Sequence, residues 1–103
     1  MDRIAMLTEL LSQDPNNAFA RYGLAMEYSN SGQFDRSLEE FEKLLSTNPD
    51  YTAGYFMFAQ TLVKAGKTPE ARKMLDSGIA SARQKGDNHA ESEMQMMLDE
   101  LSS

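Results

Sequence analysis

The amino-acid sequence repeats itself with a period of 34 residues. Identical residues recur 34 positions apart, among them Pro15 and Pro49, Ala25 and Ala59, and Gly32 and Gly66. In the same register Leu24 coincides with Phe58, and Phe41 coincides with Leu75, so apolar positions repeat as well. Periods of this length are typical of structural units that cannot bury their apolar faces alone and therefore stack on their neighbours. The sequence predicts a repeat array.

Local signals divide each period into two helices. Asn16 or Asn17 can cap a helix through its side-chain oxygen, and Gly32 follows the end of that helix. In the next period Asp50 takes the cap position, and Gly66 can adopt the left-handed conformation that ends a helix. Within the helices apolar residues recur three or four positions apart, and nothing alternates with a period of two. We therefore expect an all-α fold built from antiparallel helix pairs.

Signals for two more helices follow later in the chain. Thr68, Pro69 and Glu70 match a cap, a first-turn proline and an acid near the positive end of the helix dipole. Asn88 with Glu91 three residues later predicts a capping box. The final helix then carries one apolar stripe, made of Ala90, Met94, Met97, Leu98 and Leu101. The six expected helices span about 2–12, 17–30, 34–46, 51–65, 69–85 and 88–101.

Small residues at matching positions predict how the helices touch. Ala25 and Ala59 each stand between large apolar neighbours. Their lack of bulk would let helix axes approach closely while the neighbours fill the flanking space. We expect the large repeat-related residues to be buried together in one shared interior, namely Leu24, Phe41, Phe58 and Leu75.

Two units of the repeat follow one finer pattern. The first reads Arg21-x2-Leu24-Ala25-x2-Tyr28, Ser37-x3-Phe41 and Pro49; the second reads Tyr55-x2-Phe58-Ala59-x2-Leu62 and Ala71-x3-Leu75. This spacing resembles the tetratricopeptide repeat (TPR), W-x2-L-G-x2-Y, then A-x3-F, then P. The resemblance covers residues 2–85 and departs from the pattern at Arg21. Arg83 also stands where the closing Pro of the second unit would fall, so we expect that helix to continue to Lys85 and stop at Gly86.

The resemblance implies one domain of helix-turn-helix repeats stacked as a short right-handed α-solenoid. It divides the chain into a half-repeat helix at 2–15, a first repeat at 16–49, a second repeat at 50–86 and a capping helix at 87–103. A capping helix is needed because the last unit would otherwise leave an apolar face in water. Two full units are fewer than the three or so that usually make a stable array, so the terminal helices must complete the core.

Residue types needed for catalysis are scarce in this chain. It has no cysteine and one histidine, and its glycines form no phosphate-binding loop. His89 and Glu93 lie one helical turn apart without an evident third ligand, so we expect a solvated pair and not a metal site. Met96 should point away from Met94 and Met97, which keeps the three sulfurs from converging on Cu(I). We expect no enzyme, no cofactor and no bound metal, and an enzyme or metal carrier is the disfavoured alternative.

The net charge of −6 over 103 residues argues against nucleic acid or anionic lipid as a partner. The charge is uneven, because residues 1–50 carry −5 and residues 64–85 carry +4. Solvated helix faces explain this better than a basic binding patch. No run approaches the roughly 18 apolar residues that cross a bilayer, and no export leader is evident. Together with the lack of cysteine, this favours a cytoplasmic protein.

In the fold that the resemblance implies, the first helix of each pair lines a concave groove. Its groove positions in this sequence are Phe19, Tyr22, Met26, Asn30, Phe56, Met57, Gln60 and Lys64. Several of these are large apolar groups beyond those needed to pack the helix pairs, and such a surplus is typical of a binding surface. We therefore predict a non-catalytic scaffold that binds a protein or peptide in the groove.

Two questions about the groove stay open at the level of sequence. One branch of the family holds a terminal carboxylate with Lys, Asn and Arg, and Tyr22, Met26, Phe56 and Gln60 do not supply that clamp. An apolar extended or helical segment is therefore the expected ligand. The alternative function is self-association, in which the apolar helix faces, including the C-terminal stripe, form a symmetric homodimer. The terminal helices or a second copy of the protein would then bury some of the groove aromatics.

Overall fold

The computed structural model describes residues 2–102, and this part of the chain folds into six helices without a strand. They are α1 (Arg3–Gln13), α2 (Ala18–Asn30), α3 (Phe34–Thr47), α4 (Thr52–Lys64), α5 (Thr68–Lys85) and α6 (Asn88–Ser102). Each boundary lies within one residue of the expected one, so the all-α prediction is confirmed. None of the helices between residues 2 and 102 combines the length and apolar character required to cross a bilayer.

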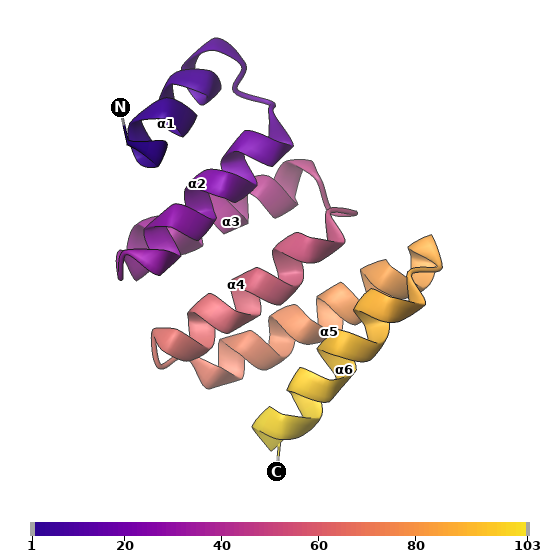
Figure 1. Ribbon diagram of the computed structural model, residues 1–103. Helices are drawn as coiled ribbons and strands as arrows, with labels where there is room; N and C mark the ends of the chain where they lie inside the picture. Colours follow the sequence, from indigo (N-terminus) through magenta and orange to yellow (C-terminus); the bar gives the residue numbers. More distant parts are fainter. Residues whose placement is uncertain (1, 103) are drawn as a thin grey trace.

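The helices stack in chain order along one direction, with the two termini at opposite ends (Figure 1). Each helix contacts the next, and α4 also contacts both α2 and α6. Helices α2, α4 and α6 therefore form one layer, while α3 and α5 lie behind it (Figure 1). This arrangement of helical hairpins is an α-solenoid, measuring 42 × 29 × 19 Å.

The repeat-related apolar residues form the interior, but they do so in two clusters. Phe41 and Leu75 are fully buried, and Phe58 retains 6% of its surface. These three belong to the main cluster, in which the Phe41 and Phe58 rings stack with centroids 5.5 Å apart. Leu24 is also buried, yet it packs with Leu7 of α1 in a separate cluster. The expectation of one shared interior is wrong, because α1 draws its own apolar side chains onto α2.

Arg21, which departs from the repeat pattern, ties α2 to its surroundings by polar contacts. Its Nη1 lies 2.6 Å from Oε1 of Glu40 on α3, and its Nη2 donates to the carbonyl oxygen of Pro15 at 3.0 Å. The Arg21 and Glu40 side chains retain only 17% and 13% of their exposure. A partly shielded, hydrogen-bonded pair therefore occupies a position where the family pattern has an aromatic ring.

The left-handed helix ends occur where the sequence predicts them. Gly66 after α4 and Gly86 after α5 have φ angles of 78° and 71°, a region that L side chains rarely adopt. The helix of the second unit does continue to Lys85, as expected from the lack of a closing Pro. Helix α5 is consequently 18 residues long, whereas α3 has 14.

The predicted helix caps are only partly correct. Asn17 is the N-cap of α2, and its side chain accepts a hydrogen bond from the Ala20 amide at 3.0 Å. Asp50 is not the cap of α4, because the chain extends one residue further and Tyr51 takes that position without a side-chain bond. Thr68 lies inside the first turn of α5, which Lys67 precedes as N-cap.

The capping box predicted for the last helix is also wrong. The chain turns immediately after Gly86, so Asp87 reaches the cap position one residue before Asn88. Its carboxylate accepts a hydrogen bond from the Ala90 amide at 3.1 Å. The side chain of Glu91, the expected second half of the box, instead lies 2.7 Å from Nε of Arg83.

Small residues bring α3 into close contact with α2 and α4, the two helices of the layer in front of it. Ala25 and Ala59 are fully buried, as expected. The Ser37 hydroxyl on α3 donates to the carbonyl oxygen of Ala25 at 2.8 Å. Close packing and a buried hydrogen bond hold these backbones together, so α3 is a rigid support for α2 and α4.

Candidate functional site

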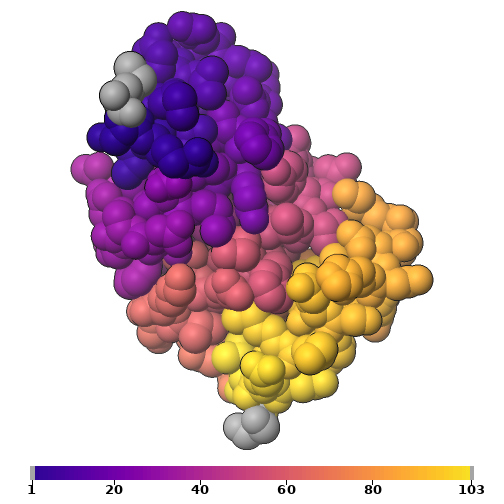
Figure 2. Space-filling model, viewed as in Figure 1, coloured from indigo at the N-terminus to yellow at the C-terminus, as the bar shows by residue number. Residues whose placement is uncertain are grey.

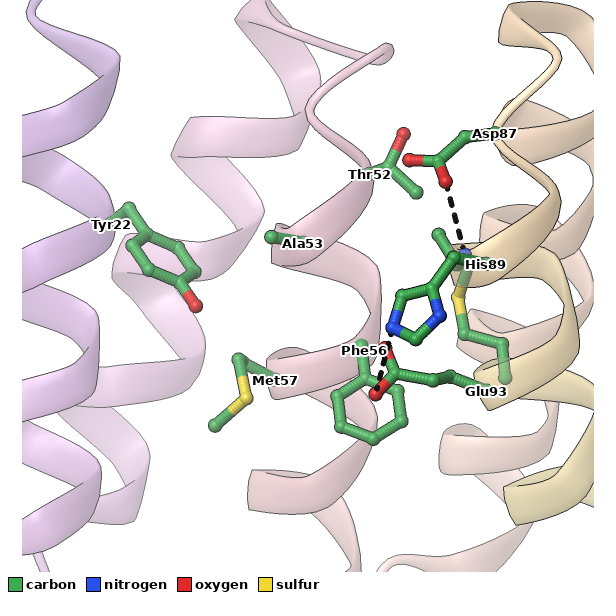
Figure 3. Close-up of a pocket in the computed structure, with 10 residues that line it drawn as sticks. Tyr22, Thr52, Ala53, Phe56, Met57, Asp87, His89 and Glu93 are labelled. Carbon is green, nitrogen blue, oxygen red and sulfur yellow. Dashed lines mark hydrogen bonds and ion pairs between the residues drawn. The ribbon is translucent and has the colours of Figure 1, made fainter.

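The layer of α2, α4 and α6 presents a hollow of about 370 Å³ to solvent. All three helices contribute side chains to it, and Figure 2 shows their surfaces meeting on this face. Tyr22 points from α2 toward α4, while Glu93 approaches Phe56 from α6 (Figure 3). The lining residues are Tyr22, Thr52, Ala53, Phe56, Met57, Asp87, His89, Ala90, Glu93 and Met94.

A second hollow of about 380 Å³ adjoins the first. It lies between α4 and α6 and is lined by Phe56, Gln60, Glu93, Met96, Met97 and Glu100. Phe56 and Glu93 belong to both hollows. The residues that line either hollow are called the α4–α6 groove below.

The structure brings together four of the eight groove residues that the sequence indicated. Tyr22, Phe56 and Met57 line the first hollow, and Phe56 and Gln60 line the second. These four side chains are half-buried, which leaves apolar surface accessible beside the hollows. Their role in binding a partner stays a prediction.

The other four residues indicated by the sequence line neither hollow. Phe19, in the first turn of α2, is 77% exposed. Met26 is half-buried and packs against the main core cluster. Asn30 and Lys64 are exposed at the C-terminal ends of α2 and α4. These residues flank the groove or support it, and they contribute nothing to its lining.

Tyr22 lines the groove with a ring that packs against two other aromatic rings. Its ring centroid lies 5.4 Å from that of Tyr51 and 6.4 Å from that of Phe41, the latter in an edge-on arrangement. Burial raises the pKa of Tyr22 above its ordinary value of 10.0, and the neighbouring Tyr51 adds to this. Aromatic contacts on two sides orient the ring, so a ligand meets a preformed surface.

Sequence reasoning missed the whole α6 side of the groove. The sequence predicts that helix as a cap over the last repeat and assigns it no groove residue, yet it contributes to the lining of both hollows. It supplies Asp87 from its N-terminal boundary and then His89, Ala90, Glu93, Met94, Met96, Met97 and Glu100. Its apolar stripe does pack on the core, as predicted, with Met94 only 1% exposed. The helix therefore has two roles, because one side covers the repeat and another borders the groove.

A change of register explains why the period of 34 residues did not reveal α6. Helix α4 begins 34 positions after α2, but α6 begins 36 positions after α4, because the longer α5 is followed by a shorter loop. With the corrected spacing, Ala53, Met57 and Gln60 on α4 correspond to His89, Glu93 and Met96 on α6. Aligning the predicted first residues of α4 and α6, instead of applying a fixed period, would identify these three α6 residues.

His89 and Glu93, the pair that the sequence analysis considered as metal ligands, are neighbours on α6. Nε2 of His89 lies 3.8 Å from Oε2 of Glu93, with 87% and 51% of the two side chains exposed, so this is a solvated pair (Figure 3). Within residues 2–102, no three His, Cys, Asp or Glu side chains are grouped so that they could hold a metal ion. Met96 is 64% exposed while Met94 is buried, in agreement with the predicted helical phase.

Sequence models of the tetratricopeptide repeat match residues 30–92 and residues 6–39. The first match alone spans more than half of the chain. The chain belongs to the tetratricopeptide-repeat family. In TPR terms, α2 with α3 and α4 with α5 are its helical hairpins, and the groove lies on the side of their first helices.

Comparable TPR proteins are known from sequence and structure. A TPR repeat-containing protein from Pseudomonas aeruginosa is 32% identical over 92% of this chain and 90% of its own length. A Bordetella parapertussis protein of known solution structure is 28% identical with a TM-score of 0.86, covering 99% of this chain and 89% of that one. The TPR2B domain of yeast Sti1, solved in complex with pHsp70, has a TM-score of 0.89 at 15% identity, over 96% of this chain and 79% of that one. The last likeness concerns the fold alone.

Proposed function

We propose that this TPR protein is a non-catalytic scaffold that binds a peptide or protein segment in the α4–α6 groove. The observation that carries the proposal is a surplus of accessible large apolar side chains around two adjoining hollows. Phe56 is common to both hollows, Tyr22 and Met57 border one, and Met96 borders the other with 64% of its surface exposed. Covering aromatic and methionine side chains with a partner is a strong source of binding free energy.

The comparisons support a polypeptide as the ligand. The TPR2B domain of yeast Sti1 has the same fold and was solved as a complex with pHsp70. Within residues 2–102, no Lys or Arg lines either hollow of the α4–α6 groove, which opposes recognition of a terminal carboxylate here. An internal segment with large apolar side chains suits the groove better.

A capture experiment tests the groove. The tagged wild-type protein and a Tyr22→Lys/Phe56→Lys variant are incubated with extract of the source cells, and the captured proteins are identified. We expect the variant to lose partners, because two cations would stand in the apolar hollows. A matched Ser77→Lys/Ala80→Lys variant adds the same charge at exposed positions of α5 and should keep them. Identical captured sets for all three folded proteins would count against groove binding.

Self-association is the second candidate, and one feature favours it. Met6 and Leu10 of α1 are 43% and 44% exposed, and within residues 2–102 this helix packs against α2 alone. The C-terminal apolar stripe, in contrast, packs mainly on the core of its own chain, with Met94 buried and its other members partly buried. Light scattering at several concentrations distinguishes the two candidates, since a monomer throughout excludes the homodimer.

A further inference from the structure

The charged side chains of the α4–α6 groove are mainly acidic. Asp87 and Glu93 border the first hollow, and Glu93 and Glu100 border the second. His89 is the basic side chain that lines them within residues 2–102, and it stands beside Glu93. Helix α6 as a whole contains four acidic residues and neither Lys nor Arg. The groove therefore has an apolar floor with a negative rim on one side.

Four basic residues outside the groove lining have other neighbours. Lys67 and Lys73 line a separate hollow of about 330 Å³ between α3, α4 and α5, together with Glu42 and Glu70. Arg83 is paired with Glu91, with 2.7 Å between its Nε and Oε2 of the carboxylate. Lys85 borders a small hollow together with Asp87, but its Nζ donates to the carbonyl oxygen of Asp50 at 3.0 Å. None of these four side chains lines either hollow of the α4–α6 groove.

Glu93 is the acidic group best placed to meet a ligand. It is shared by the two hollows and lies next to Phe56 in Figure 3. About half of its side chain (51%) is exposed, so a carboxylate oxygen can accept a bond from a bound cation. Asp87 is less free, because its carboxylate already caps α6. A side chain that passes from the apolar floor to solvent would meet Glu93 at the rim.

Methionine gives the floor an adaptable shape. Met57 in the first hollow and Met96 and Met97 in the second have flexible, polarisable side chains that can rearrange around different apolar groups. Such a floor selects for apolar bulk more than for one particular side chain. Selectivity must then come from the charged rim.

We propose that the groove binds a cationic, apolar segment, in which Lys or Arg residues alternate with large apolar residues. This inference rests on the groove function proposed above. The apolar side chains enter the hollows beside Phe56, and the ammonium or guanidinium groups lie against Glu93. Complementary charge speeds the encounter and rejects acidic segments, while burial of apolar surface supplies most of the affinity.

Two synthetic peptides of equal length test the proposal, one alternating Leu with Lys and the other Leu with Glu, each carrying the same fluorophore. Fluorescence anisotropy gives the Kd of each for the purified protein. We expect the Lys peptide to bind and the Glu peptide to bind at least ~10-fold more weakly, a difference of about 1.4 kcal/mol. Raising the salt concentration should narrow the gap, because the rim is exposed.

Matched variants distinguish the rim from the overall charge of the protein. Glu93→Lys should raise the Kd of the Lys peptide roughly 10-fold. Glu39→Lys makes the same charge change at an exposed site on α3 and should alter that Kd by less than about 2-fold. Equal losses in both variants would mean unspecific attraction to an acidic protein and would overturn the proposal. Failure of the Lys peptide to bind, or equal affinity for the Glu peptide, would overturn it as well.

A neutral variant separates this inference from the groove function itself. Phe56→Ala removes apolar surface without changing the charge, and circular dichroism checks that the variant is folded. If Phe56→Ala raises the Kd of both peptides, and wild type binds the two peptides equally well, the groove is a binding site and the cationic specificity is wrong. If Phe56→Ala leaves the Kd of the Lys peptide unchanged, that peptide binds elsewhere and both proposals fail at this site.

Discussion

Ser29 on α2 and Thr61 on α4 bring their hydroxyl oxygens within 2.9 Å of each other in the interior. Both residues are buried, with 5% and 0% of their surfaces exposed. Thr61 Oγ1 also lies 2.9 Å from the carbonyl oxygen of Met57, an acceptor that takes its single proton. Ser29 must then be the donor to Thr61. A directed chain of hydrogen bonds therefore joins α2 to α4 behind the groove.

Thr61→Val should destabilise the protein by about 1–3 kcal/mol, because it leaves the buried Ser29 hydroxyl without its acceptor. Removing both hydroxyls, with Ser29→Ala added, should cost less than the two single changes together, since no group is then left unpaired. Urea unfolding of the four proteins completes the double-mutant cycle. Strictly additive free energies of unfolding would contradict this hydrogen-bond chain.

Gly78 on α5 is buried where a side chain has no room. A Cβ atom at this position would lie 2.5 Å from Met94 Sδ and 2.6 Å from Tyr55 Cβ. We expect Gly78→Ala to cost about 1–3 kcal/mol by overpacking, despite the better helix propensity of Ala. The matched control is Gly23→Ala, where the nearest atoms are the two Cδ atoms of Leu7 at 3.4 Å. Thermal melts should place Gly78→Ala well below wild type and Gly23→Ala near or above it.

Ala59 tests the role of small residues between the helices. It is fully buried in the main core cluster, so Ala59→Leu must push apart helices that are packed at full density. We expect a loss of about 1–3 kcal/mol in the free energy of unfolding. Denaturant curves measure it, and Ala80→Leu at an exposed site of α5 is the control. A midpoint for Ala59→Leu at or above that of wild type would refute the close contact.

Most of the fold could be predicted because the same helix and burial signals occur in two repeats and confirm each other. The coincidence of Phe41 with Leu75, and of Leu24 with Phe58, identified buried positions independently of any single helix signal. Caps were less predictable, since Asp50, Thr68 and Asn88 are all good capping residues placed one position from the actual cap. A cap depends on where the preceding loop ends, and neighbouring polar residues compete for it on nearly equal terms.

The site was less accessible to sequence reasoning than the core. Tyr22 and Phe56 were found because they repeat on the first helices of two pairs, whereas Glu93 belongs to a helix whose register is shifted. The shift arises where α5 extends to Lys85, and a fixed period cannot follow it. Phe19 has the helical position of a groove residue, yet it is 77% exposed and lies outside both hollows.

The partly buried tyrosines predict how stability depends on alkaline pH. Burial raises the pKa values of Tyr22, Tyr51 and Tyr55 above 10.0, with Tyr51 adding to the effect at Tyr22 and Asp50 at Tyr55. The folded state thus holds phenolic protons that the unfolded chain releases near its ordinary pKa. The stabilising contribution is fully present below about pH 10 and is lost as the pH rises through the folded-state values.

Thermal melts between about pH 8 and pH 11 measure this dependence. For wild type we expect a flat melting temperature up to roughly pH 10 and a fall above it. Tyr22→Phe/Tyr51→Phe keeps the ring contact, whose centroids lie 5.4 Å apart, and removes two of the protons. It should melt near wild type at the lower pH and lose less stability at the higher one. Parallel curves for the two proteins would show that other groups cause the alkaline loss, because the variant differs from wild type only in these two phenols.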